Sequence, residues 1–174
     1  RALGDLGPEP LCGGCGAKVA PGGLSAVLAQ ERPPSRADIV TGPGDDAAVI
    51  MVGGVRQVLT TDHLRGFTED LGVMARIAAL HALGDVWAMG AKPQAALVSV
   101  TVPRMSEGLQ ARTMAEIMAQ AGEALRASGA EIVGGHSTLG AEANIGFTVT
   151  GLLERDAITV AGARVGTGQQ QILP

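Results

Sequence analysis

Two short apolar runs near the middle of the chain predict a β-hairpin. Residues 47–51 (AAVIM) and 55–61 (VRQVLTT) are rich in β-branched side chains, and Gly53 and Gly54 lie between them. A pair of glycines between two such runs is typical of a tight hairpin turn, because both central residues of that turn need positive φ. We therefore predict two antiparallel strands joined at these glycines.

The segment 69–90 has apolar residues at helical spacing and predicts an α-helix. The residues that fall on one stripe are Met74, Ile77, Ala78, His81, Ala82 and Met89. Thr68 is the expected N-cap, and Gly90 is expected to end the helix.

The remaining periodic segments complete the pattern. Helices are predicted over 24–31 and 106–129, and strands over 94–102, 130–137 and 143–154. The order is helix, two strands, helix, strand, helix, two strands. This order indicates an α+β fold in which helices cover one face of a mostly antiparallel or mixed sheet.

The chain divides into an arm and one domain. Residues 1–23 are rich in glycine and proline and show neither periodicity, so we predict a flexible arm. Residues 24–174 are enough for one domain and too few for two. The closing stretch VGTGQQQILP begins another apolar run with nothing after it. We therefore expect the chain to be half of something larger.

Composition excludes several classes of partner. Charged residues make up 17% against a usual share of about 25%, which suggests that extra surface is buried against a partner. The net charge of −4 and an aromatic content of 2% do not favour nucleic acid. The start RALGDLGPEP is not a signal sequence, no run of about 18 uncharged apolar residues predicts a membrane span, and two cysteines fit a reducing cytoplasm.

Three acidic positions are expected to converge at one edge of the predicted hairpin. Asp45 and Asp46 come just before its first strand, and Asp62 comes just after its second strand. The entry of one antiparallel strand lies beside the exit of its partner. Each aspartate taken alone also fits an ordinary turn cap or strand end.

Asp85 is the more informative carboxylate, because it falls within the apolar stripe of the predicted helix. At 100° per residue it lies about 20° from Met74. An unpaired carboxylate on that face costs several kcal/mol, so Asp85 needs a cation, hydrogen-bond donors or a raised pKa. Together with Asp45, Asp46 and Asp62 it predicts a site for Mg²⁺ or Mn²⁺ with bound phosphates.

A second glycine-rich segment, IVGGHSTLG at 132–140, offers backbone N–H groups that can cradle phosphate. It matches neither the dinucleotide fingerprint nor the P-loop. A plain hairpin explains it equally well.

The N-terminal arm carries Cys12, Cys15 and Lys18. The C-x-x-C spacing suggests a redox pair, but no convincing strand precedes it. A zinc site would need two more ligands, and the three histidines have no paired spacing. The remaining functional interpretation is a loop that carries Cys15 as nucleophile and Lys18 as phosphate partner. An ordinary disordered terminus remains the alternative.

Five segments occur in the order and spacing of one known family: GGCGAKV, GDDAAV, LTTDH, ALGDVWAMGAKP and GGHS. From about residue 11 to its end the chain resembles selenophosphate synthetase (selenide, water dikinase), within the aminoimidazole ribonucleotide synthetase superfamily. The resemblance implies that ATP, selenide and water give selenophosphate, AMP and phosphate, with Mg²⁺ as cofactor.

The resemblance also implies residue roles. Cys15 and Lys18 match the catalytic positions, and Asp46 and Asp85 match the magnesium ligands. The positions implied for ATP binding are Lys18, Gly44, Asp45, Asp62, Asp85, Gly134, Gly135, His136 and Ser137.

The family further implies a homodimer whose N-terminal domains share a β-barrel. Two features depart from the family: Ala17 stands where many members have cysteine while Cys12 lies nearby, and the family's C-terminal domain is missing after Pro174. We therefore expect weak or no turnover from this chain alone. The alternatives are another superfamily enzyme, such as thiamine-monophosphate kinase or aminoimidazole ribonucleotide synthetase, or a non-catalytic dimerisation module.

Overall fold

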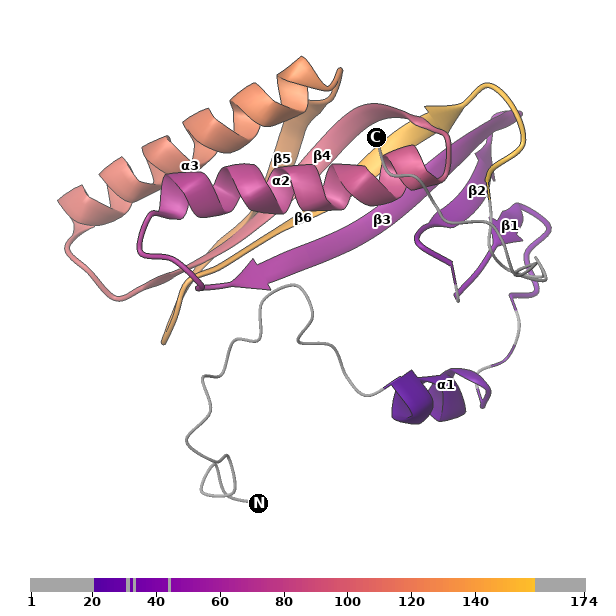
Figure 1. Ribbon diagram of the computed structural model, residues 1–174, viewed down its shortest axis with the longest axis horizontal. Helices are drawn as coiled ribbons and strands as arrows, with labels where there is room; N and C mark the ends of the chain where they lie inside the picture. The colour runs from indigo at the N-terminus through magenta and orange to yellow at the C-terminus, as the bar shows by residue number, and fades with distance from the viewer. Residues whose placement is uncertain (1–20, 31, 33, 44, 159–174) are drawn as a thin grey trace, which may run out of the picture.

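The computed structural model describes residues 21–30, 32, 34–43 and 45–158 (Figure 1). Within these residues three helices and six strands follow one another. They are α1 (Pro21–Leu28), β1 (Ile39–Thr41), β2 (Ala48–Val52), β3 (Val55–Arg65), α2 (Leu71–Ala88), β4 (Lys92–Pro103), α3 (Glu107–Ala127), β5 (Glu131–Gly140) and β6 (Asn144–Leu153).

The six strands form one mixed sheet in the order β1-β2-β3-β6-β4-β5. β4 and β5 are parallel and the other neighbouring strands are antiparallel. The predicted α+β class, the mixed sheet and the element order are confirmed. The one addition is β1, whose three residues are too few to show an alternating pattern.

The predicted hairpin is confirmed at its turn and is longer than predicted on one side. Gly53 and Gly54 have φ of 57° and 85°, and Val52 pairs with Val55 across them. β3 continues to Arg65, because β6 pairs with it over its whole length from Arg56. Asp62 therefore lies inside β3 and not after the end of the strand.

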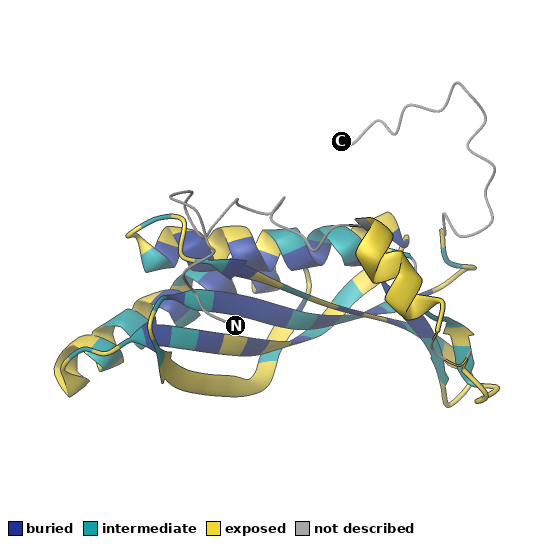
Figure 2. Cartoon of the chain, turned by 90° about the horizontal axis from the view of Figure 1, so that it is seen from below, coloured by how far each residue is buried: buried dark blue, intermediate teal, exposed yellow. Residues whose placement is uncertain are grey.

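Helices α2 and α3 cover one face of the sheet, and the opposite face is uncovered by any described element (Figures 1 and 2). Alternate residues of the central strands face the helices and are buried, as expected for a sheet covered on one side. The largest fully buried side chains include Phe147 and Ile145 of β6, Met74 and Leu83 of α2, and Ile117 of α3.

The predicted helix around Asp85 is confirmed, with two corrections. Asp70, and not Thr68, caps α2, and its side chain accepts a hydrogen bond of 2.8 Å from the Val73 amide. Ile77 is 39% exposed and does not belong to the buried stripe. Only the sheet and α3 cover α2 within the described residues, so a side chain on its third side stays in solvent.

The helix predicted over 24–31 begins earlier. α1 starts at Pro21, inside the segment predicted as the arm, because proline is well suited to the first turn of a helix. Among the described elements, none makes more than slight contact with α1.

The strand predicted over 130–137 is confirmed, and it continues through the glycine-rich segment to Gly140 instead of turning there. β5 runs through it in parallel with β4. At Gly135 an added Cβ would lie 2.0 Å from the Val98 carbonyl oxygen, so this approach of the two strands admits only glycine. The glycines therefore serve strand packing here.

Candidate functional site

Asp85 lies on α2 where the helix crosses β3, and Thr60 of β3 holds its carboxylate. The Thr60 hydroxyl donates a hydrogen bond of 2.7 Å to Asp85 Oδ2. Thr60 is a buried polar residue of the core, with 6% of its surface exposed, and Asp85 is half-buried. The hydrogen bond fixes the direction of the Asp85 carboxylate relative to the sheet.

A second pair links the same strand and helix. His81 Nε2 lies 2.8 Å from Asp62 Oδ2, a contact that requires a proton on Nε2. Asp62 lies two residues after Thr60 on β3, so these two side chains share one face of the strand. His81 lies four residues before Asp85 on α2, so these two side chains share one face of the helix. The other Asp62 oxygen accepts a hydrogen bond of 2.9 Å from the His63 amide.

Asp46 completes a group of three carboxylates. It precedes β2, whose first residue, Ala48, pairs with Leu59 of β3, so that the chain before β2 reaches the stretch of β3 that carries Thr60 and Asp62. Asp45, next to it, accepts a hydrogen bond of 3.0 Å from the Asp46 amide. The predicted approach of the residues before the first strand to Asp62 is thus consistent with the strand register.

The electrostatics of this group are unfavourable without a cation. Burial raises the pKa of Asp85, and the charges of Asp62 and Asp46 raise the pKa further, while the Thr60 hydrogen bond and His81 lower it. Among the described residues no ion pair includes Asp85. A cation placed between Asp85 and Asp46 would reverse the repulsion that raises this pKa.

The donor set fits a magnesium ion that keeps water and phosphate ligands. Within the described part of the chain, no three His, Cys, Asp or Glu side chains are arranged to hold a metal by themselves. Mg²⁺ does not need such a cage, because it is usually bound by one or two carboxylates together with water and substrate phosphates. Asp46 and Asp85 supply two carboxylates of the required type.

The other predicted ATP-binding positions are not brought into this group. Gly134, Gly135, His136 and Ser137 lie on β5, and β6 and β4 separate β5 from β3. Asp62 pairs with Phe147, Phe147 with Val98, and Val98 with Gly135, which puts Asp62 and Gly135 in one row, roughly 14 Å apart at ~4.8 Å per strand. Cys12, Cys15, Lys18 and Gly44 lie outside the described residues.

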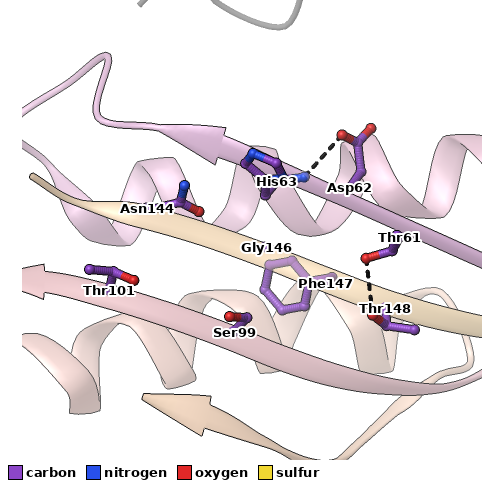
Figure 3. A pocket seen from close by; sticks show the side chains of 9 residues that line it. All are labelled: Thr61, Asp62, His63, Ser99, Thr101, Asn144, Gly146, Phe147 and Thr148. Carbon is purple, nitrogen blue, oxygen red and sulfur yellow. Dashed lines mark hydrogen bonds between the residues drawn. The ribbon is translucent and has the colours of Figure 1, made fainter. Parts of the chain in front are cut away.

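A concave region of about 290 Å³ lies on the uncovered face of the sheet (Figure 3). Its polar side chains come from three neighbouring strands and include Thr61, His63, Ser99 and Thr148. Thr148 donates a hydrogen bond of 3.1 Å to Thr61. Successive strand residues point to opposite faces, so Thr61 and His63 face this hollow and Thr60 faces the helices. Asp62, which contacts His81 of α2, is also among the residues that line the hollow (Figure 3), so the hollow borders the carboxylate group at Asp62.

Sequence reasoning missed two residues of the site, Thr60 and His81. Both have a signal that could have found them, because Thr60 is two residues from Asp62 along a strand and His81 is four residues from Asp85 along a helix. A polar residue two positions away on a strand, or four positions away on a helix, lies on the same face as a functional carboxylate and can belong to the same hydrogen-bonded group.

Comparison with known families decides the relationship of this chain. The family described as "AIR synthase related protein, N-terminal domain" matches residues 44–153, which include all three carboxylates. The chain belongs to this family.

Curated relatives of this AIR synthase related chain are named "Selenide, water dikinase". One from Nitratidesulfovibrio vulgaris (strain Miyazaki F) is 41% identical over 161 residues, covering 88% of this chain and 45% of the relative. One from Desulfitobacterium hafniense (strain Y51) is 38% identical, covering 81% and 42%. The predicted resemblance to selenophosphate synthetases is confirmed, and the chain spans slightly less than half the length of these relatives.

Solved structures of similar fold agree with the observed architecture. The protein tt0281 from Thermus thermophilus superposes with a TM-score of 0.64 at 23% identity, covering 80% of this chain and 45% of that one. The structure titled "AaThiL complexed with AMPPCP and TMP" superposes with a TM-score of 0.60 at 24% identity, covering 82% and 43%. At this identity the likeness establishes the fold.

We predict that Asp85→Asn stabilises this domain at neutral pH. Because the pKa of Asp85 is raised in the fold, its ionisation favours the unfolded chain. This cost to stability is absent at a pH below the ordinary carboxyl pKa, which is near 4. It grows as the pH rises from there and is complete above the raised pKa of the folded protein. Thermal unfolding of both proteins is measured between pH 4 and pH 8. The Tm of the variant minus that of the parent should increase with pH, by roughly 2–4 °C for each kcal/mol of difference in the free energy of unfolding.

The matched control is Asp156→Asn, whose carboxylate is 88% exposed and pairs with Arg56 at 2.9 Å. It should show no gain in Tm as pH rises. An Asp85→Asn protein that is less stable than the parent at pH 8 would show that the Thr60 hydrogen bond outweighs burial and repulsion.

Proposed function

We propose that this chain is the ATP- and Mg²⁺-binding half of a selenophosphate synthetase, an enzyme that converts ATP, selenide and water to selenophosphate, AMP and phosphate. The proposal is supported by relatives named selenide, water dikinase at 38–41% identity over most of the chain. It is supported independently by the carboxylate group, whose charge repulsion calls for a multivalent cation.

The observation that carries the proposal is the environment of Asp85. A half-buried carboxylate, hydrogen-bonded by Thr60 and near two other carboxylates, is maintained against an electrostatic penalty. Such penalties are typical of functional sites, where stability is exchanged for a prepared charge arrangement. Bound Mg²⁺ would neutralise phosphate charge and orient the phosphates for in-line attack.

The residues of the chain have separate tasks in this site. Asp46 and Asp85 hold the metal, and Thr60 keeps the Asp85 carboxylate pointed toward it. Asp62 contacts the nucleotide with one oxygen, while His81 restrains the side chain. Asp45, Gly44 and the β5 positions 134–137 are proposed as further nucleotide contacts.

Lys18 and Cys15 are proposed to act from the N-terminal arm. Lys18 would stabilise charge developing on the transferred phosphate, because a cation in a closed site interacts more strongly than in water. Cys15 would serve as the nucleophile or as an aid to selenium delivery. The spacing Cys15-Gly-Ala-Lys18 supports this pairing.

We further propose a homodimer formed through the uncovered sheet. β5 is an edge strand of ten residues with no proline and a single charge, Glu131, and its outer edge is unpaired within the described structure. Long edges with few charges pair readily with another strand. Exposed Leu59 and Leu97 on the uncovered face add apolar area, and a second sheet packed there would form a shared barrel.

The activity is tested by ³¹P NMR on a chimera in which this chain is joined to the C-terminal part of the 41%-identical relative. With ATP, selenide and Mg²⁺ we expect selenophosphate and AMP. Cys15→Ser should abolish selenophosphate formation, and the matched Cys12→Ser should retain it. ADP without AMP would favour a kinase such as thiamine-monophosphate kinase, and no nucleotide turnover with normal folding would favour a dimerisation module.

The metal site is tested by calorimetry of a non-hydrolysable ATP analogue with and without Mg²⁺, using the same chimera. Asp85→Asn should lose the Mg²⁺-dependent part of the affinity, about 1–3 kcal/mol for one charged contact. Asp156→Asn, whose carboxylate is 88% exposed and pairs with Arg56, should bind like the parent. Equal Mg²⁺ dependence in the Asp85→Asn protein would remove Asp85 from the metal site.

The dimer is tested by sedimentation velocity over a series of concentrations. Leu97→Lys places a charge on the uncovered sheet face and should shift the protein to monomer. Leu109→Lys, on α3 and of similar exposure, is the control and should leave the dimer intact. A parent protein that is monomeric at every concentration would contradict the proposal.

A further inference from the structure

The outer side of α2 carries an exposed apolar stripe that the proposed function does not use. Its members are Val73, Ile77, Leu80, Gly84 and Trp87, spaced by four, three, four and three residues. The four side chains are 47%, 39%, 40% and 46% exposed. At 100° per residue all five positions fall within a sector of about 80°.

This sector is continuous and is bordered by polar residues. On one side is Arg76, whose Nη1 lies 3.8 Å from Glu123 Oε2 of α3. On the other side is His81, which contacts Asp62. No charged side chain of α2 lies between them, and the 3-4 spacing over about 21 Å is the pattern by which one helix packs on another element. A contiguous patch of this kind on a soluble domain marks an interface.

The proposed homodimer leaves this stripe uncovered. The stripe is exposed on α2, which covers one face of the sheet (Figures 1 and 2). The edge of β5 and the exposed residues Leu59 and Leu97 belong to the sheet itself and to its opposite face. A second copy packed on the uncovered face of the sheet therefore buries a different surface from the stripe. The stripe needs a different occupant.

The path of the chain identifies the occupant. After β6 the backbone returns to the C-terminal end of α2, where the Ile158 amide donates a hydrogen bond of 3.1 Å to the Met89 carbonyl. The Ile158 side chain lies against Gly90, where an added Cβ would be 3.2 Å from its Cδ1. Polypeptide that follows Ile158 thus begins at the C-terminal end of α2, in the turn that also carries Trp87, although Met89 itself lies about 160° around the helix from Trp87.

The relatives supply polypeptide at that point. The match covers 45% of the Nitratidesulfovibrio vulgaris protein and belongs to an N-terminal domain, so more than half of that protein lies outside the matched region. We propose that the stripe on α2 is the docking surface for the C-terminal part of these longer proteins, which packs an apolar face on Val73, Ile77, Leu80 and Trp87.

This docking would also bring the C-terminal part to the edge of the carboxylate group. Asp85 lies about 80° around the helix from Ile77, and His81 lies between them. A domain seated on the stripe would therefore border Asp62 and Asp85 and restrict the access of water to them. The interface and the proposed site share one helix.

Trp87 is the single tryptophan of the chain and reports directly on the stripe. Its emission maximum and acrylamide quenching are measured in the 174-residue chain and in the chimera with the C-terminal part of the Nitratidesulfovibrio relative, with any tryptophan of the added part replaced by phenylalanine. We expect an exposed indole in the chain alone, and in the chimera a blue-shifted emission with quenching reduced severalfold. Unchanged quenching in a folded chimera would overturn the proposal.

Variants separate specific docking from general effects. A protease site is placed at the junction, and the cleaved halves are examined by gel filtration. Leu80→Lys should release the C-terminal part, while Leu109→Lys, of similar exposure on α3, should leave the halves together. Retention of the halves by the Leu80→Lys protein, with Trp87 still protected, would show that they associate elsewhere.

Other occupants give different results. Protection of Trp87 in the 174-residue chain would assign the stripe to residues 159–174 if it is independent of concentration, or to a second copy if it grows with concentration.

α2 is also long and apolar enough to cross a membrane by length and composition alone. A blue shift of Trp87 on addition of phosphatidylcholine vesicles would assign the stripe to a lipid surface. Each of these results would overturn the proposal, and none of them depends on catalytic activity.

Discussion

The hydrogen bond between Thr60 and Asp85 is the interaction on which the arrangement of the site depends. It joins the helix layer to the sheet at the one place where a carboxylate of α2 enters the boundary between them. A buried hydroxyl without this acceptor would lose its partner, and the carboxylate without this donor would be left beside other negative charges. Apolar packing holds α2 on the sheet, and this bond fixes the direction of the functional group relative to β3.

Asp85 also shows how far the sequence predicts this site. The helix could be predicted from its periodicity, but the residues that surround Asp85 could be predicted only in part. Periodicity placed Asp85 among apolar residues, which correctly indicated partial burial and the need for compensation. Periodicity does not tell which neighbour supplies the compensation, since Thr60 reaches Asp85 through the tertiary packing of a strand 25 residues away. The predicted buried face of the helix was also too broad. Ile77 has the right spacing for the core but faces the side that no described element covers.

The strands show a similar division between local and tertiary information. The Gly53-Gly54 turn needs positive φ at both residues, so its sequence determines its structure. The pair Gly134-Gly135 has the same composition but lies in a strand, because β4 requires a close approach at Gly135. Likewise β3 extends past Asp62 because β6, which comes much later in the chain, provides the pairing. Glycine signals a backbone requirement, and only the fold shows whether it is a turn or a contact.

The position of the carboxylates relative to the uncovered surfaces accounts for the expected weakness of the isolated chain. Asp62 and Asp85 lie between the sheet and α2, beside the stripe, and are not enclosed by the described residues on that side. Charges open to water attract a cation and phosphates weakly, because solvent screens the interaction, whereas the same charges in a closed site act strongly. A domain docked on α2 would exclude water from one side, and the N-terminal arm would cover the phosphates from another. In this arrangement the contact nearest to the acidic group would be on the Ile77 and His81 side of α2, and a domain packed there would lower the effective dielectric around Asp62 and Asp85.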